Sequence, residues 1–280
     1  MLKILHKREV APRIHEMVIE APDIAAKAQP GHFVIAMADE VGERIPLTIA
    51  DYDRAAGSVT LVLMTVGVSS TKLSRLNEGD SLYALIGPLG HPSEMGNFGS
   101  VILVAGGVGT APVYPIAKKL HELGNHVTVI QGARTKDILF WTEKMAGACD
   151  EHIVVTDDGT AGRKALVTEP LKEILEAKAA EIGCIWIIGP AIMMKFCAKT
   201  TEPFGVKTFA SLNTIMIDGT GMCGGCRCTV GGQTKFTCCD GPEFDAHAID
   251  WDSVLKRQQI YKCEEKCAMD RYVATWQQEQ

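Results

Sequence analysis

The first third of the chain alternates short apolar runs with turn residues. Runs rich in β-branched and apolar side chains recur at similar spacing, and Gly, Pro or Asp turns separate them. Many short strands at such spacing are typical of a small antiparallel barrel. We therefore expect barrel strands at His15–Ile19, His32–Met37, Ser58–Met64 and Ser81–Ile86.

From Ser100 onward the pattern changes to that of an α/β sheet. A fully apolar run is followed by a glycine-rich turn, an amphipathic helix that ends at Gly124, and a second apolar run. Strand, turn, helix and strand in this order form one βαβ unit, and later repeats of the pattern extend a parallel sheet. The expected strands are Val101–Ala105, Val127–Ile130, His152–Thr156 and Cys184–Ile188, and the expected helices are Val113–Leu123 and Thr168–Glu181.

After about residue 209 the pattern gives way to a glycine- and cysteine-rich segment and a polar C-terminal helix. The sequence therefore predicts a multidomain β and α/β protein with a small third domain. We expect an antiparallel barrel over residues 1–97, a parallel α/β sheet over residues 98–208, and a cysteine-rich domain with the C-terminal helix over residues 209–280.

Composition narrows the class of protein. The chain has 280 residues, 46% hydrophobic residues and a net charge of −6, which argues against a nucleic-acid binder. The longest apolar run, Phe33–Ala38, is far too short for a membrane helix, and the N-terminus lacks a signal-peptide pattern. Ten cysteines without such a signal indicate free or liganded thiols in a reducing compartment, so we expect a cytoplasmic protein.

Five of the ten cysteines lie between Asp218 and Cys239, among many glycines. Thiolates must converge on iron in an inorganic cluster, and glycines let backbone N–H groups approach the cluster sulfurs. The plant-type [2Fe–2S] spacing is C-x4-C-x2-C with a distant fourth ligand. Cys223 and Cys226 form the middle pair, Cys238 is the distant ligand, and Asp218 occupies the first position. We expect these four residues to hold a [2Fe–2S] cluster, with the carboxylate as a harder donor than thiolate.

Other interpretations of the cysteines remain open at this point. Zinc is one, because C-x2-C also opens zinc knuckles, but its second pair would be the adjacent Cys238 and Cys239. Plain packing is another, since free cysteine behaves as a small hydrophobe. Within the cluster interpretation, Cys228 or Cys239 could replace a proposed ligand. Cys263 and Cys267 lie apart on the polar tail, and we expect them to be unliganded.

A glycine-rich loop follows the first strand of the α/β sheet and opens its helix. Small residues there let a pyrophosphate lie against the helix N-terminus, where free N–H groups and the helix dipole favour anions. The same pattern also occurs in βα turns without a ligand. Polar or glycine residues follow the later strands, at the edge where open α/β sheets bind ligands. The expected dinucleotide-binding residues are Gly106, Gly107, Gly109, Thr110, Ala111, Pro112, Arg134, Asp157, Asp158, Gly189 and Pro190.

Two segments of the barrel suit a flavin. A guanidinium and hydroxyls at turns can hold a pyrophosphate, and a strand backbone can grip the edge of a flavin ring. An ordinary polar strand and barrel turn would have the same residue types. The expected FAD-binding residues are Arg44, Pro46, Leu47 and Thr48 in the first segment and Gly67, Ser70 and Thr71 in the second.

These segments together resemble the ferredoxin reductase superfamily over nearly the whole chain. Arg44–Thr48 is similar to its flavin-binding motif, with Ile45 where a second arginine often lies. Gly87–Gly90, Gly106–Pro112 and Cys238–Phe244 also match. Within the superfamily the chain resembles the group that contains the electron-transfer subunit of dihydroorotate dehydrogenase B.

A narrower resemblance rests on Asp218 and on Glu43–Asp51. Both resemble the small subunit in the electron-bifurcating family of NADH-dependent reduced ferredoxin:NADP+ oxidoreductases. The resemblance implies a heterodimer in which this chain carries FAD and [2Fe–2S] and reacts with NAD(H). The large subunit would carry a second flavin, the NADP(H) site and [4Fe–4S] clusters, with ferredoxin as an indirect partner.

The expected activity follows from these cofactors. FAD exchanges hydride with NAD(H) and single electrons with the cluster, so the protein supplies orientation and potential while the cofactors carry the chemistry. We expect no side chain that acts as a catalytic acid, base or nucleophile. The alternatives are the electron-transfer subunit of dihydroorotate dehydrogenase B and a non-enzymatic zinc-binding module.

The acidic pair after the third strand of the sheet favours NADH over NADPH. Arg134 and Lys136 could attract a 2′-phosphate, but Asp157 and Asp158 can accept hydrogen bonds from ribose hydroxyls and would repel that phosphate. Members of the superfamily that use NADP tend to have serine and arginine there. The segment Asp157-Asp158-Gly159 also has the sequence of an ordinary Asp-Gly turn, which needs no ligand.

Overall fold

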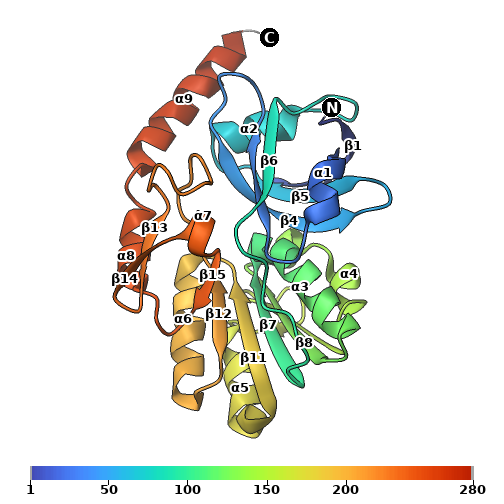
Figure 1. Ribbon diagram of the computed structural model, residues 1–280, viewed down its shortest axis with the longest axis vertical. Helices are drawn as coiled ribbons and strands as arrows, with labels where there is room; N and C mark the ends of the chain where they lie inside the picture. The colour runs from blue at the N-terminus through green and yellow to red at the C-terminus, as the bar shows by residue number, and fades with distance from the viewer. Residues whose placement is uncertain (1, 279–280) are drawn as a thin grey trace.

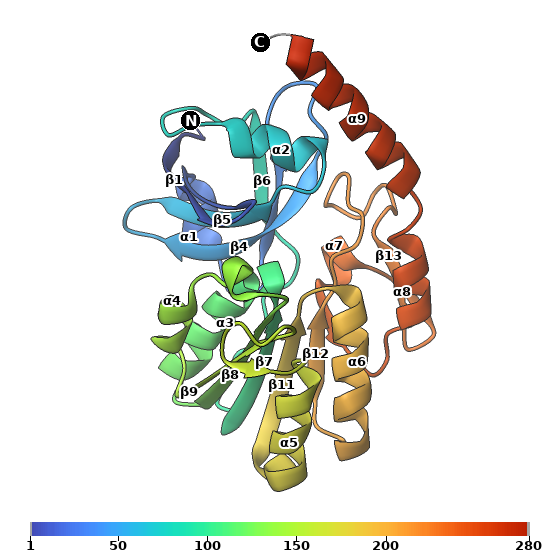
Figure 2. The same cartoon turned by 180° about the vertical axis from the view of Figure 1, so that it is seen from behind.

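The computed structural model describes residues 2–278 and contains an upper antiparallel unit, a lower α/β unit and a C-terminal segment beside both (Figures 1 and 2). The upper unit is a six-stranded sheet in the order β1-β2-β5-β4-β3-β6, with every named pair antiparallel. Lys3 bridges to Ser81, so the two edges of the sheet approach each other as in a barrel. Its elements are β1 (Ile4–Ala11), β2 (Ile14–Glu20), α1 (Pro22–Lys27), β3 (Phe33–Met37), β4 (Ile45–Asp53), β5 (Ser58–Met64), α2 (Val68–Arg75) and β6 (Ala84–Leu89).

The lower unit is a seven-stranded sheet in the order β10-β9-β8-β7-β11-β12-β15. All its pairs are parallel except that of β12 with β15. Its strands are β7 (Ser100–Gly106), β8 (His126–Ala133), β9 (Glu151–Thr156), β10 (Arg163–Lys164), β11 (Ile182–Ile188), β12 (Thr208–Ser211) and β15 (Glu243–Asp245). Its helices are η1 (Gly107–Gly109), α3 (Thr110–Glu122), η2 (Lys136–Ile138), α4 (Thr142–Ala146), α5 (Thr168–Lys178), η3 (Ala179–Glu181), α6 (Ala191–Thr201) and η4 (Glu202–Phe204).

Helices cover both faces of this sheet. Alternate residues of β7 face opposite sides, as the period of a strand requires. Ile102 and Val104 belong to the same buried cluster as Leu171 of α5. Leu103 belongs to the opposite cluster, with Val113 of α3. Burial on both faces explains why β7 is apolar throughout.

The C-terminal segment contains a small hairpin and three helices. Its elements are β13 (Arg227–Val230), β14 (Gln233–Phe236), α7 (Thr237–Asp240), α8 (Trp251–Arg257) and α9 (Lys262–Gln278). Gly231 and Gly232 join β13 to β14 with φ values of 58° and 75°, which suits a two-residue hairpin turn. Figures 1 and 2 show α9 running from this segment up beside α2 of the barrel.

The fold class predicted from the sequence is confirmed, with differences in detail. The Gly67–Lys72 segment, expected as a barrel turn, enters helix α2 at Val68. The expected Ser81–Ile86 strand is shifted to Ala84–Leu89. β15, from the third expected domain, completes the sheet of the second, so the expected domain limits stay predictions.

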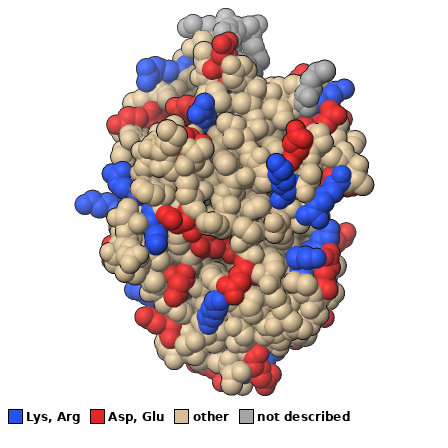
Figure 3. Space-filling view, in the orientation of Figure 1, with Lys and Arg blue, Asp and Glu red and all other residues tan. Residues whose placement is uncertain are grey.

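The surface of the described residues adds two observations. On the face drawn in Figure 3, acidic and basic side chains are interspersed and neither sign forms a continuous field. Within residues 2–278, no helix combines the length and the apolar character needed to cross a bilayer.

Candidate cofactor-binding site

Two of the expected cluster ligands already lie side by side. The Sγ atoms of Cys226 and Cys238 are 3.1 Å apart, and both residues are buried. Burial raises the pKa of Cys238 most, and the neighbouring thiols raise it further. A bound cation is therefore needed to favour its thiolate. Cys239 is only partly buried, with its Sγ 3.5 Å from that of Cys238.

The backbone around these cysteines is arranged as a cradle for sulfur. The N–H of Cys238 points at the Sγ of Cys226 at 3.5 Å, and the N–H of Gly225 points at the Sγ of Cys223 at 3.4 Å. The carbonyl of Cys226 faces away and accepts hydrogen bonds from the N–H and hydroxyl of Thr237. Carbonyls held on the outside leave N–H groups facing the cysteines, as an anionic cluster requires.

Asp218 lies at the start of the same loop. Its Oδ1 accepts from the N–H of Thr220 at 2.9 Å, and its Oδ2 accepts from the N–H of Cys223 at 2.8 Å. These hydrogen bonds lower the pKa of Asp218, and the bond from Thr220 has the largest effect. The structure therefore links the Asp218 carboxylate to the backbone N–H of Cys223 and brings the Sγ atoms of Cys226 and Cys238 together. That arrangement fits a two-iron cluster in which four protein ligands are shared between two metals.

The other cysteines differ in position. Cys228 is buried in a different apolar cluster, that of the α/β sheet, and the hydroxyl of Thr237 contacts its Sγ at 3.6 Å. Burial is the main cause that raises its pKa. Cys263 and Cys267 are exposed on α9. Within the described residues, no three His, Cys, Asp or Glu side chains form a group that could hold a single metal ion.

The cluster segment packs directly on the barrel. Phe33 and Ile35 of β3 form one buried group with Met216, Cys226 and Cys238. A Cβ on Gly219 would lie 2.8 Å from side-chain atoms of Ile35 and Leu89, so only glycine allows this close approach. The cysteine-rich loop is thus held against one face of the barrel by apolar contacts.

The expected flavin segment lies on the adjacent strand. β4 pairs with β3, with Thr48 opposite Phe33 and Pro46 opposite Ile35. Residues directly opposite each other in an antiparallel pair project to the same face. Pro46 and Thr48 therefore share the face on which the cysteines pack, whereas Leu47 packs toward the barrel core. Neighbouring strands lie about 5 Å apart, so the two cofactor segments are adjacent.

The second flavin segment meets the first at the N-terminus of α2. The hydroxyl of Ser69 lies 3.5 Å from the carboxylate of Glu43, next to the exposed Arg44. Ser70 is buried, and its hydroxyl accepts the N–H groups of Val66 and Gly67. Arg44 thus follows a residue that contacts the first turn of α2, and a helix N-terminus suits a pyrophosphate. Through these two hydrogen bonds the Ser70 hydroxyl fixes the backbone of the loop before the helix. Thr71 follows Ser70 on the first turn of the helix.

The loops after β7 and β11 touch backbone to backbone. A Cβ on Gly109 would lie 2.2 Å from the carbonyl oxygen of Ile188, and one on Gly106 would lie 2.2 Å from Sδ of Met193. This close approach explains in structural terms why Gly106 and Gly109 are glycines. Thr110 and Ala111 are buried, and Thr110 accepts a hydrogen bond from Gln131. Gly189 and Pro190 form the facing loop and lead into α6.

The polar residues after β8 and β9 lie together at the same edge. The N–H of Asp157 donates to the carbonyl of Ala133 at 3.0 Å, and that of Asp158 to the carbonyl of Arg134 at 3.3 Å. Arg134, Asp157 and Asp158 are exposed. The carboxylate of Asp158 accepts from the N–H and hydroxyl of Thr160, which lowers its pKa. Asp157 makes no such side-chain bond among the described residues, so its carboxylate is the more available of the two.

A residue that the sequence analysis missed lies where the three parts meet. Glu243 of β15 accepts from the hydroxyl of Ser93, after the barrel, and from Nε1 of Trp186 on β11 at 3.1 Å. Burial raises the pKa of Glu243 to about 7. In the sequence, Glu243 stands out only as the residue after Asp-Gly-Pro. Its role could not be predicted, because its partners Ser93 and Trp186 are far away in the chain.

Comparison with known proteins agrees with this geometry. Residues 213–250 match the iron–sulfur cluster binding domain of dihydroorotate dehydrogenase B, and residues 103–199 match the oxidoreductase NAD-binding domain. A Thermotoga maritima homologue of the electron transfer subunit of dihydroorotate dehydrogenase B (NAD(+)) is 45% identical, covering 98% of this chain and 96% of that protein. The Bacillus caldolyticus electron transfer subunit is 32% identical, covering 89% of this chain and 97% of its own.

Solved structures show the same relationship. A chain from a structure of NADH-dependent reduced ferredoxin-NADP oxidoreductase, described in the context of flavin-based electron bifurcation, has a TM-score of 0.92 and 44% identity, with 98% of each chain covered. A Neisseria gonorrhoeae ferredoxin NADP+ reductase with bound FAD and NADP has a TM-score of 0.60 at 17% identity, covering 73% of this chain and 90% of that one. The second likeness shows the fold alone.

The fold and the site together define a subunit of a ferredoxin-reductase-type oxidoreductase with an added iron–sulfur segment. The predicted superfamily and the predicted NAD and iron–sulfur cofactors are thereby confirmed, and FAD fits the fold. The chain belongs to the family of electron-transfer subunits of dihydroorotate dehydrogenase B and their homologues. The individual contact residues stay predictions, and the matches give no support to a zinc-binding module.

Proposed function

We propose that this chain is the NAD(H)-reactive subunit of an electron-bifurcating, NADH-dependent ferredoxin:NADP+ oxidoreductase. When bound, FAD supplies exchange between hydride and single electrons, and the [2Fe–2S] cluster carries electrons one at a time. The observation that carries the proposal is the packing of Cys226 and Cys238 on β3, beside the strand that bears Pro46 and Thr48. The two redox groups would then be neighbours inside one chain.

The residues of the chain bind and orient rather than react. Arg44 and the N-terminus of α2 would hold the flavin pyrophosphate, and the backbone of Pro46–Thr48 would hold the ring. Gly107 and Pro112 at the start of α3 would receive the nucleotide pyrophosphate. Asp218, Cys223, Cys226 and Cys238 would hold the cluster. Packing of the loop on Phe33 and Ile35 excludes water from its inner side.

A larger partner subunit follows from the family, whose named members are electron-transfer subunits. For this chain we propose a partner with a second flavin, an NADP(H) site and [4Fe–4S] clusters, with ferredoxin reacting there. Support comes from the 44% identity and full-length coverage shared with the bifurcating oxidoreductase chain.

The second candidate is the electron-transfer subunit of dihydroorotate dehydrogenase B. The match of residues 213–250 to the cluster-binding domain of that enzyme favours it. It would use the same cofactors in this chain with a different catalytic partner.

Purification of the tagged chain from its own cells, with its partner attached, separates the two candidates. The proposal expects flavin and iron–sulfur absorption bands and NADH-dependent reduction of NADP+ coupled to ferredoxin reduction. Dihydroorotate-dependent reduction of NAD+ by the purified complex would favour the second candidate instead. Absence of both flavin and iron–sulfur bands would contradict both.

A further inference from the structure

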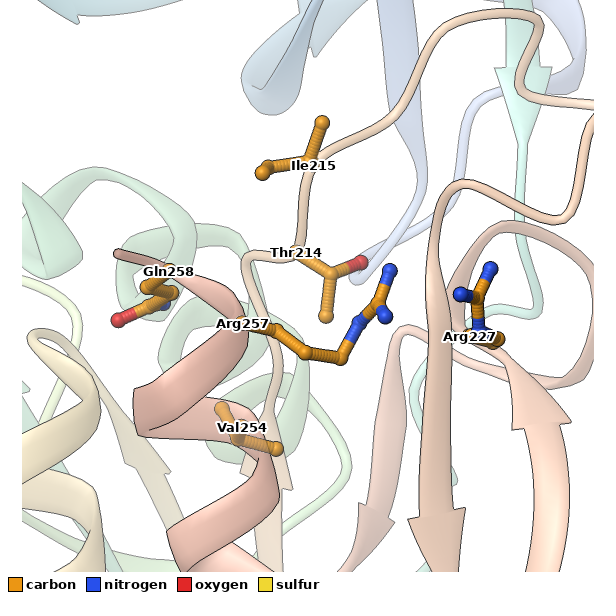
Figure 4. A pocket seen from close by; sticks show the side chains of 6 residues that line it. All are labelled: Thr214, Ile215, Arg227, Val254, Arg257 and Gln258. Carbon is orange, nitrogen blue, oxygen red and sulfur yellow. The ribbon is translucent and has the colours of Figure 1, made fainter. Parts of the chain in front are cut away.

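Two arginines hold the outer side of the loop between Cys223 and Cys226. Arg257 donates through Nη2 to the carbonyl of Gly225 at 2.9 Å, and Arg227 donates through Nη1 to the carbonyl of Gly224 at 3.1 Å. Figure 4 shows the Arg257 side chain extending from α8 toward Thr214 and β13, the strand that carries Arg227. Each arginine thus contacts one of the two glycine carbonyls that lie between the expected cluster ligands Cys223 and Cys226.

Helix α8 fixes the position of Arg257. Asp250 caps the helix by accepting the N–H of Ser253, and the indole N–H of Trp251 donates to the carbonyl of Ala246 at 2.9 Å. Trp251 and Val254 are buried, so the next residues at helical spacing face the same side. Arg257 is at that spacing and is only partly exposed. The helix therefore directs this guanidinium at the loop.

The neighbouring polar groups leave the positive charge in place. Thr214 and Gln258, which line the same small cavity, are neutral. Asp240, an acidic side chain of the same segment, accepts the N–H of Phe236.

The physical effect of these contacts has a definite sign. A cluster held by thiolates and a carboxylate has a net negative charge, and one-electron reduction adds another negative charge. Nearby cations stabilise the reduced form more than the oxidised form. By holding the carbonyls outward, the arginines also keep loop N–H groups directed at sulfur, and such hydrogen bonds act in the same direction.

We propose that Arg257 and Arg227 are positioning residues that raise the reduction potential of the cluster in this chain. They act through the carbonyls of Gly225 and Gly224 and through their charge, without ligating iron. The inference rests on the proposed function because it requires the cluster. It extends that function by naming residues outside the ligand set that set how readily the cluster accepts an electron from the flavin.

The test is a redox titration of the purified complex followed by the EPR signal of the reduced [2Fe–2S] cluster. Arg257→Gln and Arg227→Gln should each shift the midpoint to a more negative potential, and the double variant should shift it further. Lys256→Gln is the matched control, because it removes the same charge from an exposed position of α8. Arg257→Lys keeps the charge and should shift the midpoint less than Arg257→Gln.

The outcomes are distinguishable. The inference is overturned if Arg257→Gln and Arg227→Gln shift the midpoint potential no more than Lys256→Gln does. In that case an EPR signal in the wild type would still leave the proposed function standing. Absence of the signal from the wild type contradicts the proposed function itself. If Arg257→Gln does not fold, the exposed Arg227→Gln and the charge-preserving Arg257→Lys decide by the same comparison.

Discussion

At the scale of single residues, two roles are open to Asp218, because both of its oxygens accept N–H groups of its own loop. It either ligates iron or only stabilises the turn before Cys223. Asp218→Asn keeps an oxygen acceptor without the charge, Asp218→Cys supplies a thiolate, and Asp218→Ala removes both functions.

If Asp218 is a ligand, Asp218→Cys should retain the cluster with a changed EPR spectrum and a shifted potential, because thiolate is a softer donor. Asp218→Asn and Asp218→Ala should lose or alter the cluster signal. Cys239→Ser serves as the control for the neighbouring thiol and should leave the spectrum unchanged. An unaltered spectrum and potential in Asp218→Ala would assign the carboxylate to the turn alone.

Nucleotide choice is also set by single residues. Asp157 has the more available carboxylate at the edge of the sheet, while Asp158 is engaged by Thr160. Replacing both, Asp157→Ser with Asp158→Arg, removes the repulsion of a 2′-phosphate and adds a cation. The ratio of kcat/KM for NADH over NADPH should fall roughly tenfold, equivalent to about 1.4 kcal/mol.

The measurement is the reduction of an artificial electron acceptor by the chain with each nucleotide. Glu202→Gln, at an exposed carboxylate before the amino end of β12, is the control and should keep the wild-type ratio. A wild-type protein that uses NADPH as well as NADH would contradict the assignment before any variant is made.

At the scale of elements, periodicity predicted the strands and helices whose faces are regular. β7 and β5 were found because their residues are apolar or alternate, and α3 because it follows a glycine turn. The sequence did not reveal helix α2, whose Ser-Ser-Thr-Lys start has weak helix propensity and is stabilised by the Ser70 cap.

The sites were predictable to the same degree. Cysteine spacing indicated the cluster, and glycines after a buried strand indicated the nucleotide loop. Spacing could not tell that Thr110 and Ser70 point into the protein, or that Arg257 reaches the loop, because these contacts depend on packing between distant segments. The edge strand β15 was missed for the same reason, since only its pairing with β12 defines it.

The contact between α9 and α2 predicts an effect on flavin retention. Arg75 of α2 donates to the hydroxyl of Tyr272 at 2.6 Å and lies over its ring at 4.9 Å. Loss of this contact, worth about 1 kcal/mol, frees the helix whose N-terminus we assign to FAD. Tyr272→Ala should therefore raise the FAD dissociation constant by roughly fivefold.

Gel filtration followed by measurement of the flavin content checks this effect. Tyr261→Ala, at an exposed tyrosine before α9, is the control. Equal flavin content in both variants would mean that α9 does not support the flavin helix.

At the scale of the whole molecule, Glu243 joins the three parts and should make stability depend on pH. Its pKa is raised from 4.5 to about 7 by burial. The protonated form is therefore favoured in the folded state, and the stabilisation present below pH 4.5 is lost as pH rises through 7. A shift of this size corresponds to roughly 3 kcal/mol at pH 8.

Glu243→Gln keeps a neutral hydrogen-bonding side chain at that position. Its thermal midpoint should be near that of the wild type at pH 5 and higher by several degrees at pH 8, since about 1 kcal/mol shifts a protein of this size by roughly 2 to 4 °C. Glu181→Gln, at an exposed carboxylate before β11, should follow the wild type at both values. Parallel pH curves for Glu243→Gln and the wild type would contradict a neutral Glu243.

The central claim is that electrons pass between NAD(H) and the cluster through a flavin held by this same chain. Anaerobic titration of the purified chain with NADH, followed by flavin absorbance and by EPR, tests it most directly. The account predicts bleaching of the flavin and appearance of the reduced [2Fe–2S] signal, and loss of both in flavin-depleted Arg44→Ala. Reduction of the cluster by NADH in that flavin-free variant, or a wild-type cluster that stays oxidised while the flavin is fully reduced, would contradict it.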